Sequence, residues 1–299
     1  MENSNLEIIF EDRNIIVANK PQGVPVQSDK TNSEDMLTML ANQTNSEVYL
    51  VHRLDRPVGG IMVFAKNKQS CACLSEQVQN KTFKKKYTAV VCGEPKDTPK
   101  TLVDYMIKNE RLNLSKIVNK NMRGAKMAEL TYSVIETAKS PDTKDDLLSL
   151  VEIDLKTGRH HQIRLQMSNN GFPLWGDTKY NKSFKHRGGF TKIALYSTSI
   201  EFKNPTTHKI EKYTIALPET YPFNIFSKRP WEKSQGLLLY HNPKFYQTLF
   251  FKKKLSQILT HKHKNFNPRQ KFIFVISHLK LLIPFRQHKK TSRKIPRSF

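Results

Sequence analysis

The 299-residue chain is long enough for one large domain or two small ones, and 37% of its residues are hydrophobic, which suits a soluble globular protein. Its 50 Lys and Arg residues against 26 Asp and Glu residues give a net charge of +24, which favours a polyanionic partner. No apolar run approaches the roughly 18 residues that span a bilayer, and the N-terminus is unlike a signal peptide, so a cytoplasmic protein without membrane attachment is expected.

Taken from the N-terminus, the hydrophobic pattern predicts many strands and few helices. Apolar or alternating runs rich in β-branched and aromatic residues predict strands at 15–18, 48–51, 61–65, 87–91, 130–135, 147–155, 194–202 and 211–217. A cap-like acidic segment at 33–35 predicts a helix start, and helical spacing of apolar residues predicts a second helix over 67–79. Because strands occur in runs with helices inserted irregularly, the pattern indicates an α+β fold rather than a parallel βαβ repeat.

The most informative segment is His52-Arg53-Leu54-Asp55-Arg56, in which a carboxylate stands between two arginines. Neighbouring guanidinium groups favour the ionised form of such a carboxylate, and an ionised carboxylate can attack carbon. The same pattern also fits a structural ion pair, in which Asp55 only neutralises its arginines. The segments that accompany it favour a role in catalysis.

Three other segments accompany it in a fixed order. They are Asn19-Lys20-Pro21-Gln22-Gly23, Lys85-Lys86-Tyr87-Thr88-Ala89, and a longer stretch that contains Thr157-Gly158-Arg159-His160-His161-Gln162-Ile163-Arg164 and Gly176-Asp177. This ordered set resembles the RluA-type family of RNA pseudouridine synthases over about residues 6–223. Because the first strand is expected within about ten residues of Met1, the chain resembles the single-domain form without an S4-type RNA-binding domain.

The resemblance implies a pseudouridine synthase fold, which is a mixed and mostly antiparallel central sheet with flanking helices and a central RNA-binding cleft. It implies that Asp55 acts at C1′ of a flipped uridine, either as a nucleophile or by removing a ribose proton. It also implies that Arg164 pairs with Asp55 and that Tyr87 packs against the target base, where its ring offers a stacking face and its phenol a proton site. The isomerisation requires no cofactor.

Several basic residues are candidates for contacts with RNA. Arg53 is expected to fill the gap that the flipped base leaves, and Arg56 is a candidate for a phosphate clamp. Contacts with the RNA backbone are expected from Lys84, Lys85, Lys86 and Arg159, and a further RNA contact is expected from His161. The alternative is that such basic residues only form a solvated surface.

The chain departs from the family pattern at two places. Pro57-Val58-Gly59-Gly60 follows Asp55 where many members have Thr-Ser-Gly, so the glycine is kept and the hydroxyl groups are lost. His160 stands where the family often has Thr. Because neither departure touches Asp55, Tyr87 or Arg164, activity is expected.

The end of the chain differs from the rest. Residues 224–299 hold 18 Lys and Arg residues and a single acid, Glu232. We therefore expect a catalytic domain at 1–223 and a basic, poorly ordered extension at 224–299. The alternative is an RNA-binding arm in which basic residues hold phosphates and aromatic residues stack on bases.

Two other functions remain possible at this point. A non-catalytic RNA-binding or ribosome-assembly factor could keep the same fold, and a glycoside hydrolase would need a second carboxylate, for which Asp177 is a candidate. No metal site is expected, because adjacent His160 and His161 point in different directions on a helix and no acid or cysteine cluster completes a ligand set. The expected partner is RNA, ribosomal RNA rather than transfer RNA, bound by a monomer.

Overall fold

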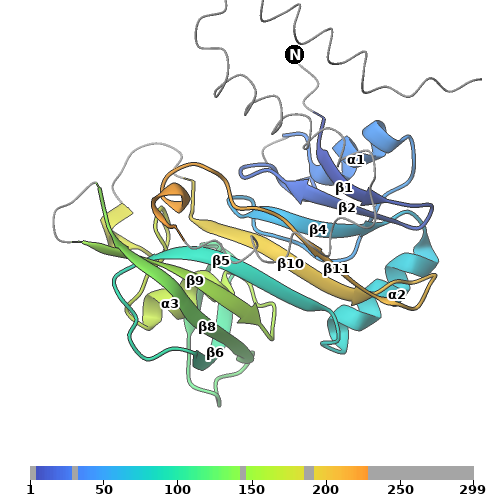
Figure 1. Cartoon of the computed structure of the whole chain (residues 1–299). Coiled ribbons are helices and arrows are strands. Elements are labelled where there is room, and N and C mark those ends of the chain that lie inside the picture. The colour runs from blue at the N-terminus through green and yellow to red at the C-terminus, as the bar shows by residue number, and fades with distance from the viewer. Residues whose placement is uncertain (1–4, 29–32, 142–145, 185–191, 228–299) are drawn as a thin grey trace, which may run out of the picture. The chain divides into compact units, whose positions relative to one another are not determined.

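The computed structural model of the chain describes residues 5–28, 33–141, 146–184 and 192–227. These residues form one mixed sheet with α-helices packed against it (Figure 1). The helices are α1 (Met36–Thr44), α2 (Lys68–Gln79) and α3 (Gln162–Asn169), and two short 3₁₀ turns cover Lys182–Phe184 and Phe223–Ile225. The strands are β1 (Glu7–Glu11), β2 (Ile15–Lys20), β3 (Tyr49–Leu50), β4 (Gly59–Ala65), β5 (Lys84–Cys92), β6 (Lys100–Asn109), β7 (Leu114–Ile117), β8 (Lys126–Lys139), β9 (Leu147–Leu155), β10 (Leu195–Lys203) and β11 (Ile210–Thr214).

The main path of the sheet runs β1-β2-β4-β10-β5-β9-β8-β6-β7, with β3 beside β4 and β11 beside β10. Among the described strands, β4 pairs with β10 in parallel, and the other pairs are antiparallel. This arrangement confirms the predicted α+β class with a mixed and mostly antiparallel sheet.

Most predicted elements are present. The predicted strands coincide with strands of the sheet, and both predicted helices form as α1 and α2. The side chain of Asp35 caps α1 by accepting a hydrogen bond from Thr38 N at 2.9 Å, and Asn67 caps α2 by accepting one from Ser70 N at 2.8 Å. The hydrophobic pattern does not predict β1, β6 or β7, because these strands bury few apolar side chains.

Alternation along β2 divides the core between the two faces of the sheet. Ile16 and Ala18 point to the face on which α1 packs, and Ile15 and Val17 point to the opposite face, on which α2 packs. Tyr87 of β5 belongs to the α1 face, and α3 packs there too. The candidate catalytic residues are therefore on the face that α1 and α3 flank.

The parallel contact between β4 and β10 fixes the start of β4, directly after the Asp55 loop. Gly60 lies opposite Ser197 at φ +123°, and a Cβ atom on Gly60 would lie 2.3 Å from Ser197 O and 2.5 Å from Ser197 N. No side chain fits at this distance, so the two strands approach one another as closely as they do only because residue 60 is glycine.

Replacing Gly60 by Ala is therefore expected to lower the free energy of unfolding by more than about 2 kcal/mol, through backbone strain and the clash with β10. Gly171→Ala is the matched control, because Gly171 also has a positive φ of +87° but has open space around its Cβ position. Urea denaturation of both variants measures the difference. If Gly60→Ala and Gly171→Ala lost the same free energy of unfolding, the close approach of β4 and β10 would not explain the cost at residue 60.

The described packing continues past the predicted domain boundary at residue 223. Phe226 is 3% exposed in the same cluster as Phe223 and Leu217, and the hydroxyl of Ser227 donates to Glu136 at 2.9 Å. Residues 228–299, where most of the predicted basic extension lies, are outside the described residues. Within the described ranges, no helix is long and apolar enough to cross a membrane.

Candidate active site

Asp55 lies on the loop that leads from β3 into β4. Its neighbours Leu54 and Val58 are buried and anchor the loop in the core, and Val58 N donates to the carbonyl oxygen of Asp55 at 2.9 Å. The Asp55 side chain is 24% exposed. A rigid loop therefore presents a carboxylate that solvent and a ligand can reach.

Lys20, at the end of β2, holds this loop from beneath. Its ammonium is fully buried and donates to three backbone carbonyl oxygens at 3.0, 3.1 and 2.8 Å, those of Pro21, Arg56 and Val58. Burial lowers the pKa of Lys20 to about 7, although the charge of Asp55 acts in the opposite direction. Lys20 thus ties the end of β2 to the residues that follow Asp55.

Arg164 does not pair with Asp55, contrary to the prediction. It lies on α3 and forms a bidentate ion pair with Asp177, with Nε–Oδ2 and Nη2–Oδ1 distances of 2.8 and 2.7 Å. Asp177 is fully buried, so its carboxylate requires a charged partner that can satisfy both oxygens. Burial acts to lower the pKa of Arg164, but Asp177 and, more weakly, Asp55 raise it above its ordinary value.

Asp177 is accordingly not a second catalytic carboxylate. Besides Arg164 it accepts hydrogen bonds from the backbone N–H groups of Lys179 and Tyr180, at 2.9 and 3.2 Å. A fully buried and fully occupied carboxylate has no exposed oxygen for a substrate, so the two-carboxylate arrangement of a glycoside hydrolase is not present at this position.

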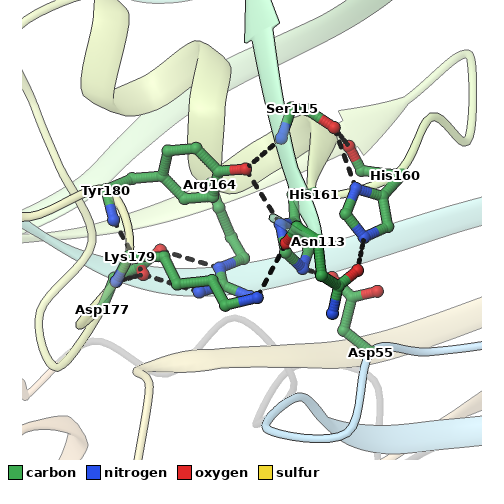
Figure 2. A network of polar contacts seen from close by, with 9 residues as sticks. All are labelled: Asp55, Asn113, Ser115, His160, His161, Arg164, Asp177, Lys179 and Tyr180. Atoms are coloured by element: carbon green, nitrogen blue, oxygen red, sulfur yellow. Dashed lines mark hydrogen bonds and ion pairs between the residues drawn. The ribbon is translucent and has the colours of Figure 1, made fainter. Parts of the chain in front are cut away.

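A chain of polar contacts connects this ion pair to Asp55 (Figure 2). The Arg164 guanidinium lies 5.4 Å from the centre of the Tyr180 ring, and the Tyr180 hydroxyl lies 2.9 Å from Nδ1 of His161. Nε2 of His161 in turn lies 3.7 Å from Oδ2 of Asp55. Tyr180 was not among the predicted site residues, although it follows Asp177 closely in the sequence.

His161 is neutral and its tautomer follows from its neighbours. Burial and the charge of Arg164 lower the pKa of His161 to about 2, so its contact with Asp55 is not a salt bridge. The Tyr180 hydroxyl accepts a hydrogen bond from Ser115 N at 2.8 Å and can donate its own proton to Nδ1. Because the Asp55 carboxylate beside Nε2 is an acceptor, we assign the ring proton to Nε2 and the accepting lone pair to Nδ1.

The backbone helps to place this ring. His161 is the N-cap residue of α3 and adopts a left-handed conformation at φ 54° and ψ 25°, which is uncommon for a residue other than glycine. His160 stacks on His161 with ring centres 3.7 Å apart, and its Nδ1 lies 2.9 Å from Ser115 Oγ. The adjacent histidines thus form a stack beside Asp55 rather than pointing in different directions.

The electrostatic surroundings of Asp55 are cationic. Lys20, Arg164 and Lys179 are all close enough for the negative charge of Asp55 to act on them. Lys179 is held in place by a hydrogen bond from Nζ to the carbonyl oxygen of Asn113 at 2.8 Å. Asp55 therefore lies among three cationic side chains.

Tyr87 lies where the sequence predicts a residue of the site. Its side chain is 6% exposed and lines the same cavity as Asp55. Burial, together with the charge of Asp55, raises the pKa of the Tyr87 hydroxyl, so the phenol remains protonated at neutral pH. The strand β5 thus places an aromatic ring and a proton donor in the wall of the Asp55 cavity.

Two cavities meet at Asp55. The larger has a volume of about 590 Å³ and is lined by Tyr87, His52, Phe83 and seven cationic side chains, which are Arg53, Lys81, Lys85, Lys108, Lys156, Arg159 and Arg164. The smaller, of about 470 Å³, extends towards Arg56 and Lys179. Among the described residues that line the larger cavity, Asp55 is the only acid.

The predicted RNA-contacting residues differ in their surroundings. Arg53 is exposed and lines both cavities, and Arg159 is exposed at the larger one. Arg56 lines the smaller cavity, but its Nε donates to the carbonyl oxygen of Gly23 at 2.8 Å, so part of its guanidinium serves the fold. His161 lines both cavities, but its side chain is only 4% exposed and its Nε2 lies 3.7 Å from Oδ2 of Asp55.

Lys86 is on the wrong face of the sheet for the predicted RNA contact. Side chains alternate along a strand, so Lys85 and Tyr87 point into the cavity while Lys86 points away from it. Lys86 instead pairs with Glu152 at 3.0 Å. Alternation along the strand separates Lys85 from Lys86, and the position of the cavity identifies Lys85 as the lining residue.

No group of three or more His, Cys, Asp or Glu side chains within the described part of the chain is arranged to hold a metal ion. The expected absence of a metal remains a prediction.

Comparisons with known proteins give a consistent result. A family model described as RNA pseudouridylate synthase matches residues 14–169. The chain is 32% identical over 225 residues to tRNA pseudouridine synthase C of Haemophilus ducreyi, covering 71% of this chain and 90% of the relative. It is 33% identical over 207 residues to ribosomal large subunit pseudouridine synthase C of Pasteurella multocida, covering 67% of this chain and 61% of the relative.

The fold is also similar to solved structures. The human RNA pseudouridylate synthase domain containing 1 aligns with a TM-score of 0.61 at 22% identity, covering 74% of this chain and 86% of that protein. At this identity the likeness supports the fold alone.

Proposed function

This chain belongs to the RNA pseudouridylate synthase family, and from that premise we propose that Asp55 is the carboxylate that acts at C1′ of a flipped uridine. The reaction breaks the bond between C1′ and N1, turns the uracil and joins C5 to C1′; C5 loses a proton to solvent and N1 takes one up, so the composition is unchanged. Asp55 suits this role because it is accessible, lies at the junction of two cavities and has cationic side chains around it. Both routes to the product, nucleophilic attack at C1′ and removal of a ribose proton, use an ionised carboxylate.

Tyr87 and Arg53 are proposed to receive the flipped nucleotide. The Tyr87 ring provides a stacking surface for uracil in the cavity wall, and its phenol remains protonated and can donate a hydrogen bond. Arg53 is exposed beside Asp55 and can occupy the place that the base leaves. Flipping costs a few kcal/mol and is least costly in loops, so a loop uridine is the expected target.

Arg164 and His161 are proposed to position Asp55 rather than to contact RNA. The ion pair with Asp177 fixes Arg164, the ring of Tyr180 packs on Arg164, and the Tyr180 hydroxyl orients His161. The N–H of His161 then faces the carboxylate from a distance of 3.7 Å. This contact fixes the direction in which the carboxylate points.

The substrate is proposed to be structured RNA, held by the cations of the larger cavity. Relatives named for transfer RNA and for ribosomal RNA both align with the chain, so they support either class. The preference for ribosomal RNA remains a prediction, as do a monomeric state, a cytoplasmic location and the division into a catalytic domain and a basic extension.

Release of tritium from transcripts labelled with [5-³H]uridine tests this function, because the C5 hydrogen is lost only when C5 bonds to C1′. Transfer RNA and ribosomal RNA transcripts are incubated with the full chain in parallel. For one class of transcript, we expect the released tritium to equal the tritium carried by a single uridine per RNA molecule. Absence of release from both classes would contradict the proposal.

Replacing Tyr180 by Phe tests the positioning of His161. The variant removes the proton donor to Nδ1, so we expect kcat to fall about tenfold, as for the loss of one hydrogen bond, while RNA affinity stays unchanged. Tyr105→Phe is the control, because Tyr105 lies outside both cavities. An unchanged kcat in Tyr180→Phe would show that the tautomer of His161 is irrelevant to the reaction.

A further inference from the structure

Lys85, in the wall of the larger cavity, is a cation that has no counterion among the described residues. It lies on β5, two residues before Tyr87, and burial lowers its pKa. Its Nζ has no ion pair or hydrogen bond to any described residue. The Nζ atom lies over the ring of Phe83, 5.9 Å from the ring centre. By contrast, the neighbouring Lys84 and Lys86 are paired with Glu201 and Glu152.

The surroundings of Lys85 offer donors and no acidic group. His52 is 8% exposed, and burial, together with the charge of Lys85, lowers its pKa to about 3, so its ring is neutral. Its Nε2 accepts a hydrogen bond from Val63 N at 3.3 Å, which places the ring proton on Nδ1. Among the described residues, Nδ1 of His52 has no hydrogen-bond partner. His52 therefore supplies no negative charge for Lys85, and its own Nδ1 donor lacks an acceptor among the described residues.

No other described group supplies the missing charge. Asp55 is the one acid among the described lining residues, and its charge has no resolved effect on Lys85, although it acts on Lys20, Arg164 and Lys179. A partly buried ammonium without a partner is unfavourable in the free protein. An anionic ligand in the cavity would remove this penalty, and the anion that RNA carries is the phosphodiester.

We propose that Lys85 binds a backbone phosphate of the RNA strand beside the flipped uridine, on the face of β5 that presents Tyr87. The inference rests on the proposed function of Asp55 and adds a phosphate subsite to it. Two residues along a strand span about 7 Å, so one strand contacts the base through Tyr87 and the sugar-phosphate backbone through Lys85. Binding at both points would fix the ribose relative to Asp55.

The test compares Lys85→Met with Lys86→Met in the full chain. Both changes remove one ammonium from β5, but only Lys85 points into the cavity. In the tritium-release assay we expect Lys85→Met to raise KM about tenfold with kcat within about twofold of the original value, and Lys86→Met to change neither. Lys85→Arg keeps the charge and is expected to restore most of the loss.

The salt dependence of binding provides a second readout that needs no catalysis. The probe is a ten-nucleotide oligouridylate, and the slope of log Kd against log salt concentration should decrease by about 0.7 in Lys85→Met but not in Lys86→Met. Equal KM values and equal slopes in the original protein and Lys85→Met would overturn the proposal. If the original protein releases no tritium but the slope still changes, the proposed function fails while the phosphate contact of Lys85 stands.

Discussion

Replacement of Asp55 by Asn is expected to lower kcat for pseudouridine formation by at least about 10³-fold. The amide has nearly the same shape as the carboxylate but carries no negative charge, so it can neither attack C1′ nor accept a ribose proton. The loop should keep its conformation, because Leu54, Val58 and the ammonium of Lys20 hold it without using the Asp55 side chain. Single-turnover tritium release with excess protein measures the effect on chemistry alone.

Asp97→Asn is the matched control for this experiment. Asp97 is exposed and lies outside both cavities, so its replacement should leave kcat unchanged. RNA affinity and the thermal midpoint of Asp55→Asn should remain close to those of the original protein. A kcat reduced less than about tenfold in Asp55→Asn would mean that another group carries out the step at C1′.

Replacement of Asp177 by Asn is expected to lower the free energy of unfolding by about 3–5 kcal/mol. The change leaves Arg164, whose side chain is only 5% exposed, with a buried charge and no ionised partner. For a domain of this size the loss corresponds to a fall in the thermal midpoint of roughly 6–20 °C. Thermal unfolding followed by circular dichroism measures the fall.

The surface pair of Lys86 and Glu152 provides the control, since Glu152→Gln breaks an ion pair of similar length in a partly exposed setting. That change should cost less than about 1 kcal/mol. The double variant Arg164→Met with Asp177→Leu should recover much of the stability, because no unpaired charge is left, but should not recover kcat. Equal destabilisation by Asp177→Asn and Glu152→Gln would contradict the structural role assigned to the buried pair.

Much of the fold and the centre of the site can be predicted from sequence. The strands that bury continuous apolar runs, such as β4 and β9, are visible in the hydrophobic pattern, and the caps Asp35 and Asn67 mark the two helix starts. The segment around Asp55 indicates the carboxylate that we propose to react. These features are local, so a single stretch of sequence contains the information that determines them.

The remaining features depend on contacts between distant residues. The partner of Arg164 is Asp177, thirteen positions later, whereas the family resemblance implies Asp55 instead. The link from Tyr180 to His161 requires the turn after Asp177 to fold back onto α3 and β7. The two-residue period of a strand places Lys85 and Lys86 on opposite faces of the sheet. Only the position of the cavity shows which of the two lines the site.

The central claim is that Asp55 converts one uridine of a structured RNA into pseudouridine. Carbodiimide modification followed by primer extension detects pseudouridine at single-nucleotide resolution in transfer and ribosomal RNA transcripts treated with the full chain or with Asp55→Asn. The account predicts a new stop next to a specific uridine with the original protein and none with Asp55→Asn. No stop on any transcript, with tight RNA binding by both proteins, would contradict it and would favour a non-catalytic RNA-binding factor on the same fold.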